Sequence, residues 1–152
     1  MTAHAHHSAP TVPAAVVLAR VTAEPIDMTR LEAMVHMAEV GATVSFVGCV
    51  RDHDHGRAVR ALEYEAHPSA QRALQAIADE VSSRHPGARL AVLHRTGRLD
   101  VGEVALGAVI GTAHRADAFA ACAELVEAIK GTLPIWKLQT FDDGSSEWVN
   151  CL

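Results

Sequence analysis

Several strand-like segments of this chain follow one another too closely to be parallel neighbours in a sheet. Ala42–Val50 is followed by Val59–Ala66 after a short polar loop, and Arg89–Thr96 by Glu103–Thr112 after the glycine-bounded turn GRLDVG. A parallel pair needs a crossover of about a dozen residues or more, whereas antiparallel strands can be joined by a short turn. The loop lengths therefore predict that these strands belong to antiparallel sheet.

Helical periodicity marks three segments between the strands. The first begins at Asp27, whose carboxylate can accept hydrogen bonds from the first helical amides, and is expected to end at Gly41. The second lies within residues 69–84, before a Pro-Gly stop, and the last within residues 115–130. The apolar face of the first helix is expected to comprise Leu31, Met34, Val35 and Ala38.

Three further strands complete the predicted set. They are expected at Val16–Thr22, Ile135–Phe141 and Glu147–Val149, and a turn at Asp142–Gly144 joins the last two. Strands and helices are interleaved, although several loops are too short for parallel crossovers. The chain is therefore predicted to adopt an α+β fold with largely antiparallel sheet and three main helices.

The domain organisation is simple. Residues 1–14 are rich in Ala, His and Pro and are predicted to form a disordered tail, whereas residues 15–152 contain no repeat or linker and are expected to form a single domain. No apolar run approaches the roughly 20 residues that span a bilayer, and the first residues do not resemble a secretory signal. These features predict a cytoplasmic protein.

Charge and cysteine content argue against three classes of protein. The formal net charge of −5 argues against general nucleic-acid binding, which needs a basic face. Cys49, Cys122 and Cys151 show no CxxC spacing and are odd in number, so they do not suggest a disulfide framework or a thiolate zinc site. Free thiols are expected.

Cationic side chains stand at the ends of several apolar elements. Arg51 directly follows a strand, His114 and Arg115 stand where the last helix begins, and Lys130 and Lys137 flank the break after that helix. Strand ends and helix N-termini commonly hold anions, because backbone N–H groups and the helix dipole point there. The pattern suggests a pocket for a phosphate or a carboxylate.

Each of these residues also has a purely structural interpretation. Arg51 could flank a surface loop, and His114 and Arg115 could form a solvated helix start. Lys130 lies where a cation stabilises a helix C-terminus in any case, and Lys137 could reach from its strand into water. None of the five is decisive alone.

The loop Asp52–His55 alternates Asp and His, which are possible metal ligands. Nothing elsewhere in the chain supplies a matching HxxxH or paired-carboxylate arrangement, and adjacent ligands in one short loop rarely complete a coordination sphere. No Gly-rich phosphate loop or dinucleotide fingerprint is present. We therefore expect neither a metal nor a cofactor.

Four motifs in a fixed order resemble the family of molybdopterin synthase catalytic subunits. The resemblance extends from about Val16 to Trp148. The motifs are GxVRxHxxG at residues 48–56, HRxGxLxxGE at 94–103, AHRxxAF at 113–119 and KxxxPxWK at 130–137.

The resemblance implies an α/β-hammerhead-type fold and an enzyme, a sulfurtransferase of molybdenum cofactor biosynthesis. A homodimer of these subunits would form the centre of a heterotetramer, each end carrying a small ubiquitin-like sulfur carrier with a C-terminal Gly-Gly thiocarboxylate. The reaction would convert cyclic pyranopterin monophosphate (precursor Z) to molybdopterin by adding two sulfurs as a dithiolene.

The resemblance also assigns roles by position. Lys130 and Lys137 match the catalytic lysines. The substrate-binding positions are Cys49, Val50, Arg51, His114, Arg115, Lys130, Lys137, Leu138 and Gln139.

Three of these positions depart from the family pattern. The family often has Lys at position 49, and a basic residue followed by Glu at positions 138 and 139, so side-chain roles there are open. Two alternative functions remain at this stage. One is a non-catalytic homologue that binds a carrier protein or a phosphopterin, and the other is a metal-dependent hydrolase that uses the His/Asp loop.

Overall fold

The computed structural model describes residue 12 and residues 15–150. Apart from Val12, which is buried, the predicted N-terminal tail lies outside the described residues, as does Cys151. Among the described residues, no helix is both long and apolar enough to cross a membrane.

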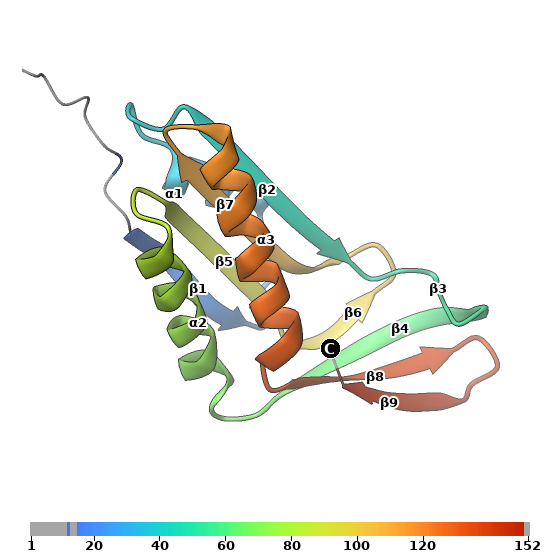
Figure 1. Cartoon of the computed structure of the whole chain (residues 1–152). Coiled ribbons are helices and arrows are strands. Elements are labelled where there is room, and N and C mark those ends of the chain that lie inside the picture. The colour runs from blue at the N-terminus through green and yellow to red at the C-terminus, as the bar shows by residue number, and fades with distance from the viewer. Residues whose placement is uncertain (1–11, 13–14, 151–152) are drawn as a thin grey trace, which may run out of the picture.

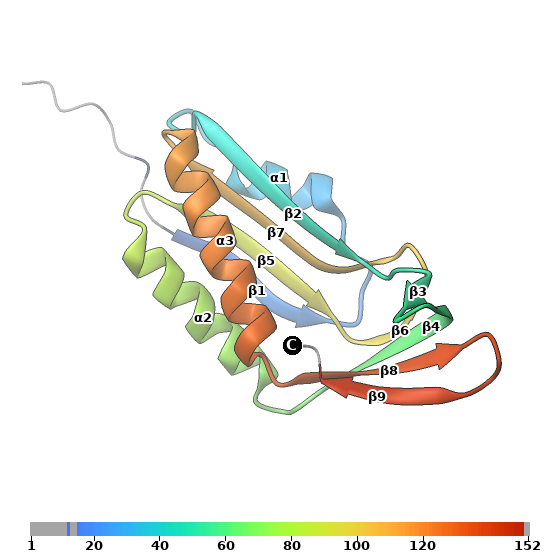
Figure 2. The ribbon, with the colours of Figure 1, turned by 45° about the vertical axis from the view of Figure 1, so that its right-hand side comes forward.

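A four-stranded sheet forms the centre of the fold (Figure 1). Two helices cover one face and a third covers the other, as Figure 2 shows from a second angle. The strand order is β1 (Ala15–Thr22), β5 (Arg89–Arg95), β7 (Val104–Thr112) and β2 (Ala42–Cys49). The helices are α1 (Met28–Val35) on one face and α2 (Ala70–Arg84) with α3 (Arg115–Thr132) on the other.

A second sheet lies beside the end of α3. It contains β3 (His53–Asp54), β4 (Arg57–Ala66), β8 (Ile135–Phe141) and β9 (Ser146–Asn150), and β6 (Gly97–Asp100) also pairs with β4. Every strand pair is antiparallel except β1–β5. The predicted α+β class, the largely antiparallel sheet and the three helices are therefore confirmed.

The central strand β7 is buried on both faces, which explains why its sequence is a continuous apolar run rather than an alternating one. On the side of α1, two glycines replace side chains. A Cβ at Gly107 would lie 2.6 Å from Sδ of Met28, and one at Gly111 would lie 2.6 Å from Cγ1 of Val35. These glycines thus allow α1 to pack directly on the strand.

Several boundaries shift by one or two residues, and the short strand β3 lies in the segment expected to be a polar loop. Two segments differ more from the sequence-based prediction. The first helix ends at Val35 rather than at Gly41, because His36 is already extended and Val40 turns back to pack beside Gly111. Ala38 therefore lies outside the helix. The segment expected to be a simple turn, GRLDVG, contains β6, whose Leu99 is fully buried opposite Leu62.

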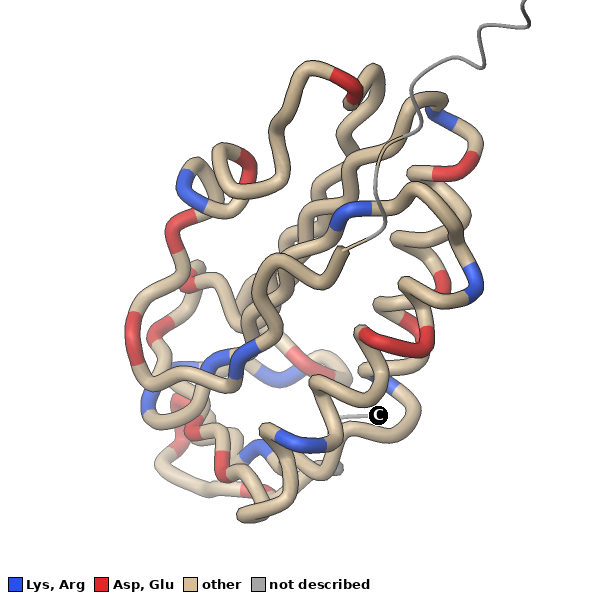
Figure 3. Tube along the Cα trace, turned by 90° about the vertical axis from the view of Figure 1, so that its left-hand side faces the viewer, with Lys and Arg blue, Asp and Glu red and all other residues tan. Residues whose placement is uncertain are grey.

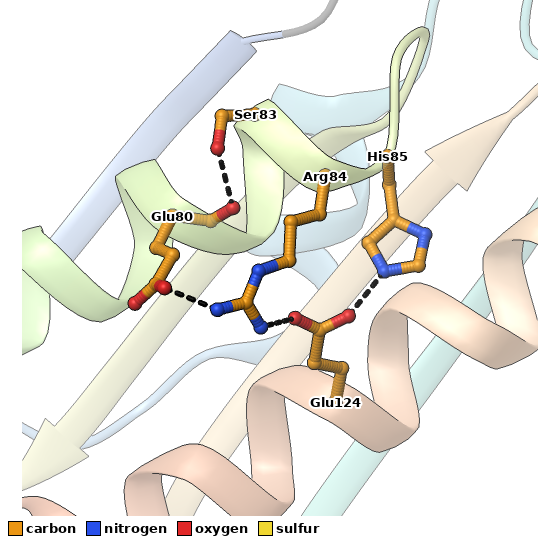
Figure 4. Close-up of polar contacts among 5 residues, drawn as sticks. All are labelled: Glu80, Ser83, Arg84, His85 and Glu124. Carbon is orange, nitrogen blue, oxygen red and sulfur yellow. Dashed lines mark hydrogen bonds and ion pairs between the residues drawn. The ribbon is translucent and has the colours of Figure 1, made fainter.

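Four polar side chains join the end of α2 to the middle of α3 (Figure 4). Oε1 of Glu124 accepts from Arg84 at 2.6 Å, and its Oε2 lies 2.5 Å from Nε2 of His85. Arg84 also pairs with Glu80 in the preceding turn. The hydrogen bond to His85, followed by the bond and charge of Arg84, lowers the pKa of Glu124.

Replacing Glu124 with glutamine is expected to lower the free energy of unfolding by about 1 kcal/mol, because the two donors lose a charged acceptor. A depressed carboxyl pKa contributes stability above the unfolded value that is lost as pH falls through the folded value. The difference between variant and wild type in urea unfolding should thus shrink in acid. Glu80→Gln is the matched control at a more exposed site. Equal effects of the two substitutions would contradict a specific role for Glu124.

Candidate active site

Three of the predicted site residues lie at the two opposite ends of α3, His114 and Arg115 at its start and Lys130 near its end. Arg115 is the first residue of the helix and Lys130 lies in its last turn. At about 1.5 Å of rise per residue, their Cα atoms are roughly 22 Å apart. His114, the N-cap residue, is exposed beside Arg115 and makes no capping hydrogen bond with its side chain. One subunit therefore does not bring His114 and Arg115 together with Lys130.

Lys137 lies near the Lys130 end, on β8, which begins just after α3 (Figure 1). It is half-buried and stands directly opposite Tyr64 of β4. Directly opposed residues of antiparallel strands project from the same face. Gln139, two residues further along β8, shares this inward face and is almost fully buried.

His94, near the end of β5, is buried and packs against Tyr64 of β4. Its ring meets that of Tyr64 edge-on, with centroids 5.3 Å apart, and its Nδ1 lies 2.8 Å from the carbonyl oxygen of Arg95. Because a carbonyl only accepts, Nδ1 carries the proton. Burial lowers the pKa of His94 to about 4, and the charge of Lys130 adds to the effect. A neutral imidazole thus lies within electrostatic reach of Lys130.

The folded protein is expected to lose roughly 3 kcal/mol of stability between pH 6.5 and 4, because only the unfolded chain protonates His94 in this window. The stability is fully present above the unfolded pKa and falls as the pH is lowered. Urea unfolding across this range should show the slope in the wild type and a flatter profile in His94→Gln. His53→Gln, at an exposed site, should keep the wild-type slope. A wild-type slope in His94→Gln would refute the assignment.

Arg51 is linked to β8 through Asp54. A guanidinium nitrogen of Arg51 lies 3.5 Å from Oδ1 of Asp54, and Oδ2 of the same carboxylate accepts from Nε2 of Gln139 at 2.7 Å. The bond from Gln139 is the main cause that lowers the pKa of Asp54, and the charges of His55, Lys137 and Arg51 add to it. Asp54 is therefore the common partner of the side chains of Arg51, Gln139 and Lys137.

The remaining predicted positions are less involved. Cys49 ends β2 as an exposed free thiol. Val50 is buried, its N–H donates to Glu103 and its carbonyl accepts from Gly102, so its backbone groups are already paired. Leu138 stands opposite Trp148 and projects from the other face of β8, away from Lys137.

The Asp/His loop makes local contacts and a contact with a distant strand. Nδ1 of His53 bonds Asp52 at 2.7 Å, while Asp54 turns inward to Gln139. Within residues 12 and 15–150, no group of three or more His, Cys, Asp or Glu side chains is arranged to hold a metal ion. His4, His6 and His7 lie outside these residues. In the view of Figure 3, basic and acidic positions are interspersed along the described trace.

Sequence reasoning assigned no site role to Tyr64 or His94, and it missed the pairing of Asp54 with Gln139. His94 lies in one of the motifs that carried the family resemblance, but it received no role. A possible signal was its place as the first polar residue after the apolar stretch of β5. Asp54 was considered only as a metal ligand, and no local pattern pointed to Gln139, 85 residues away.

Comparison with known proteins gives a consistent result. The family model of the MoaE protein matches residues 21–132. A molybdopterin synthase catalytic subunit of a Nostoc species is 38% identical over 86% of this chain and 80% of its own length, and catalytic subunit 1 of Mycobacterium tuberculosis is 40% identical over 86% and 88%. The crystal structure of molybdopterin synthase from Staphylococcus aureus superposes with a TM-score of 0.81 at 33% identity, covering 86% of this chain and 96% of that chain. The chain therefore belongs to the MoaE protein family.

Proposed function

We propose that this protein is the catalytic subunit of a molybdopterin synthase, a sulfurtransferase of molybdenum cofactor biosynthesis. It transfers sulfur from a thiocarboxylated small carrier protein to precursor Z and so forms the molybdopterin dithiolene. The observation that carries the proposal is that Lys137 and Arg51 lie within electrostatic reach of Asp54, and Lys130 within reach of His94, in a chain whose relatives are molybdopterin synthase catalytic subunits.

The cations suit the chemistry of this reaction. Both the phosphate of the substrate and the C-terminal thiocarboxylate of the carrier are anions, which ammonium and guanidinium groups hold well. Opening of the pterin ring and departure of an oxygen also need a proton donor and acceptor, roles that a lysine can fill. We propose that Lys130 holds the thiocarboxylate, that Lys137 transfers protons at the pterin, and that Arg51 binds the phosphate.

We also propose that His114 and Arg115 act in the site of a partner subunit, because they lie roughly 22 Å from Lys130 of their own chain. β2 is an edge strand of the first sheet. If β2 pairs antiparallel with its copy, Arg51 of one subunit lies near Ala42 of the other. Ala42 stands opposite Thr112, which precedes His114 by two residues. A homodimer at the centre of a heterotetramer would thus complete two equivalent sites.

Conversion of precursor Z by the purified chain and a thiocarboxylated carrier tests the function. Dithiolene formation, followed by mass spectrometry, is expected with this carrier and absent with one that ends in an ordinary carboxylate. Binding of carrier and substrate without conversion would instead favour the non-catalytic homologue. Retention of both Lys130 and Lys137 supports the enzyme.

We place the reaction in the cytoplasm. A thiocarboxylate and free thiols such as Cys49 persist most readily in a reducing compartment. Fractionation of cells that produce a tagged form of the protein tests this placement, with recovery in the membrane or secreted fraction as the contrary result.

A further inference from the structure

The carboxylate of Asp54 is held more firmly than its place in a polar loop suggests. β3 and β4 form a hairpin in which Asp54 pairs with Arg57, and the two residues between them, His55 and Gly56, have φ values of 48° and 78°. Positive φ at both central residues is the geometry of a type I′ turn, the tightest connection for a twisted hairpin. The backbone of Asp54 is therefore fixed by the turn that follows it.

The side chain of Asp54 is fixed from the opposite direction. Gln139 is 2% exposed and lies on a different sheet segment, β8, and its amide donates to Oδ2 at 2.7 Å. The side chain of Asp54 is itself only 15% exposed. Its other oxygen, Oδ1, faces Arg51 at 3.5 Å and the highly exposed His55 at 3.8 Å. One oxygen is thus anchored in the protein interior, and the other faces the exposed guanidinium.

We propose that Asp54, anchored by Gln139, is a positioning residue that holds the guanidinium of Arg51 in place for the substrate phosphate. The side chain of Arg51 is 68% exposed, so without a tether it would sample many rotamers. A carboxylate fixed at the hairpin restricts this freedom before the substrate arrives, which lowers the entropy lost on binding. The inference rests on the proposed function, in which Arg51 binds the phosphate.

The amide of Gln139 decides which of the two paired side chains carries the negative charge. The resembled family often has Glu where this chain has Gln139, and a carboxylate there would face that of Asp54 at hydrogen-bond distance. The amide–carboxylate pair of this chain places the negative charge on the hairpin beside Arg51, whereas the reverse pair would place it on β8. Exchanging the carboxylate and the amide between positions 54 and 139 keeps the hydrogen-bonded pair but moves the negative charge away from Arg51. The exchange therefore shows whether the pair or the position of the charge matters.

The test compares KM for precursor Z, at saturating thiocarboxylated carrier, in the wild type, Asp54→Asn, Arg51→Ala and Arg51→Ala/Asp54→Asn. In Asp54→Asn the side-chain carbonyl can still accept from Gln139, so the pair survives but the charge is lost. We expect KM to rise by about twofold to fivefold, the scale of one largely exposed ion pair, with a smaller change in kcat. In the Arg51→Ala background the same substitution should add nothing. An unchanged KM, or a full effect without Arg51, would overturn the proposal.

The exchanged variant Asp54→Asn/Gln139→Glu provides the second comparison. Gln139→Glu alone should lower the melting temperature, because two carboxylates then meet, and the exchange should restore it. KM should nevertheless stay at the raised value of Asp54→Asn, since the charge no longer faces Arg51. Recovery of the wild-type KM would show that only the pairing matters, and would refute a positioning role for the charge.

A third measurement does not depend on turnover. NMR relaxation of the Arg51 guanidinium should report a more ordered group in the wild type than in Asp54→Asn or in the exchanged variant. Equal order in all three would also overturn the proposal. A wild type that shows this order but does not convert precursor Z would refute the proposed function while leaving the tether intact. All measurements are made at pH 8, above the ordinary range of histidine titration, so that a charged imidazole does not compete for Asp54.

Discussion

Replacing Lys130 with alanine is expected to slow dithiolene formation in a single turnover by about a hundredfold or more, the loss typical of removing one preorganised electrostatic or proton-transferring group. Lys130 lies in the last turn of α3, where the helix fixes its stem while the ammonium remains exposed. Its side chain therefore contributes little to the core, and the variant should fold. His94, within electrostatic reach, is neutral and so adds no positive charge to that of the lysine that would meet an inserted carrier tail.

Two further variants show how Lys130 acts. Lys130→Arg should recover little activity, because the longer, planar guanidinium keeps the charge but does not place it where the compact ammonium meets the thiocarboxylate. Lys137→Ala, the matched control on the neighbouring strand, should lower the rate less. Circular dichroism and titration with the carrier show whether each variant folds and binds. Near-normal turnover in Lys130→Ala would refute the proposed mechanism, although membership in the family would stand.

Mixing two inactive variants is expected to restore about a quarter of the wild-type activity if the site is shared between subunits. In a mixed dimer of Arg115→Ala with Lys130→Ala, one site receives the intact Lys130 of the first chain and the intact Arg115 of the second. The other site has neither residue. Random pairing makes about half of the dimers mixed, and each mixed dimer has one of its two sites working.

The experiment requires refolding the two variants together and measuring turnover against each variant refolded alone. Arg51→Ala mixed with Lys130→Ala is the matched control, because Arg51 and Lys130 lie at the same end of one subunit. This second mixture should recover no activity. Absence of recovery in the first mixture, under conditions where mixed dimers are detected by mass spectrometry, would place Arg115 outside the shared site.

The agreement between sequence and structure is best where the local pattern sets the structure by itself. The expected strand Ile135–Phe141 has the observed bounds, and α2 and α3 begin and end within two residues of their expected limits. In these elements, the apolar spacing and the flanking Pro and Gly residues set the secondary structure through interactions between residues close together in the chain. Burial of one face then favours the same structure that local propensity favours.

Local patterns failed where a distant partner decided the outcome. Gly97 and Gly102 both have positive φ, as turn glycines do, yet the residues between them form a strand because β4 lies alongside. The first helix was expected to continue to Gly41, but the packing of Val40 beside Gly111 of β7 ended it earlier. In both cases a tertiary contact outweighed a weak local preference.

For the site, the sequence by itself determined the set of cations and, through four ordered motifs, the family. It did not determine which of these residues meet. The length of α3 separates Arg115 from Lys130, and the β3–β4 hairpin brings Asp54 to Gln139. Burial beside Tyr64 of β4 keeps His94 neutral. Distances and desolvation depend on how elements remote in the chain pack together, so only the tertiary structure decided them.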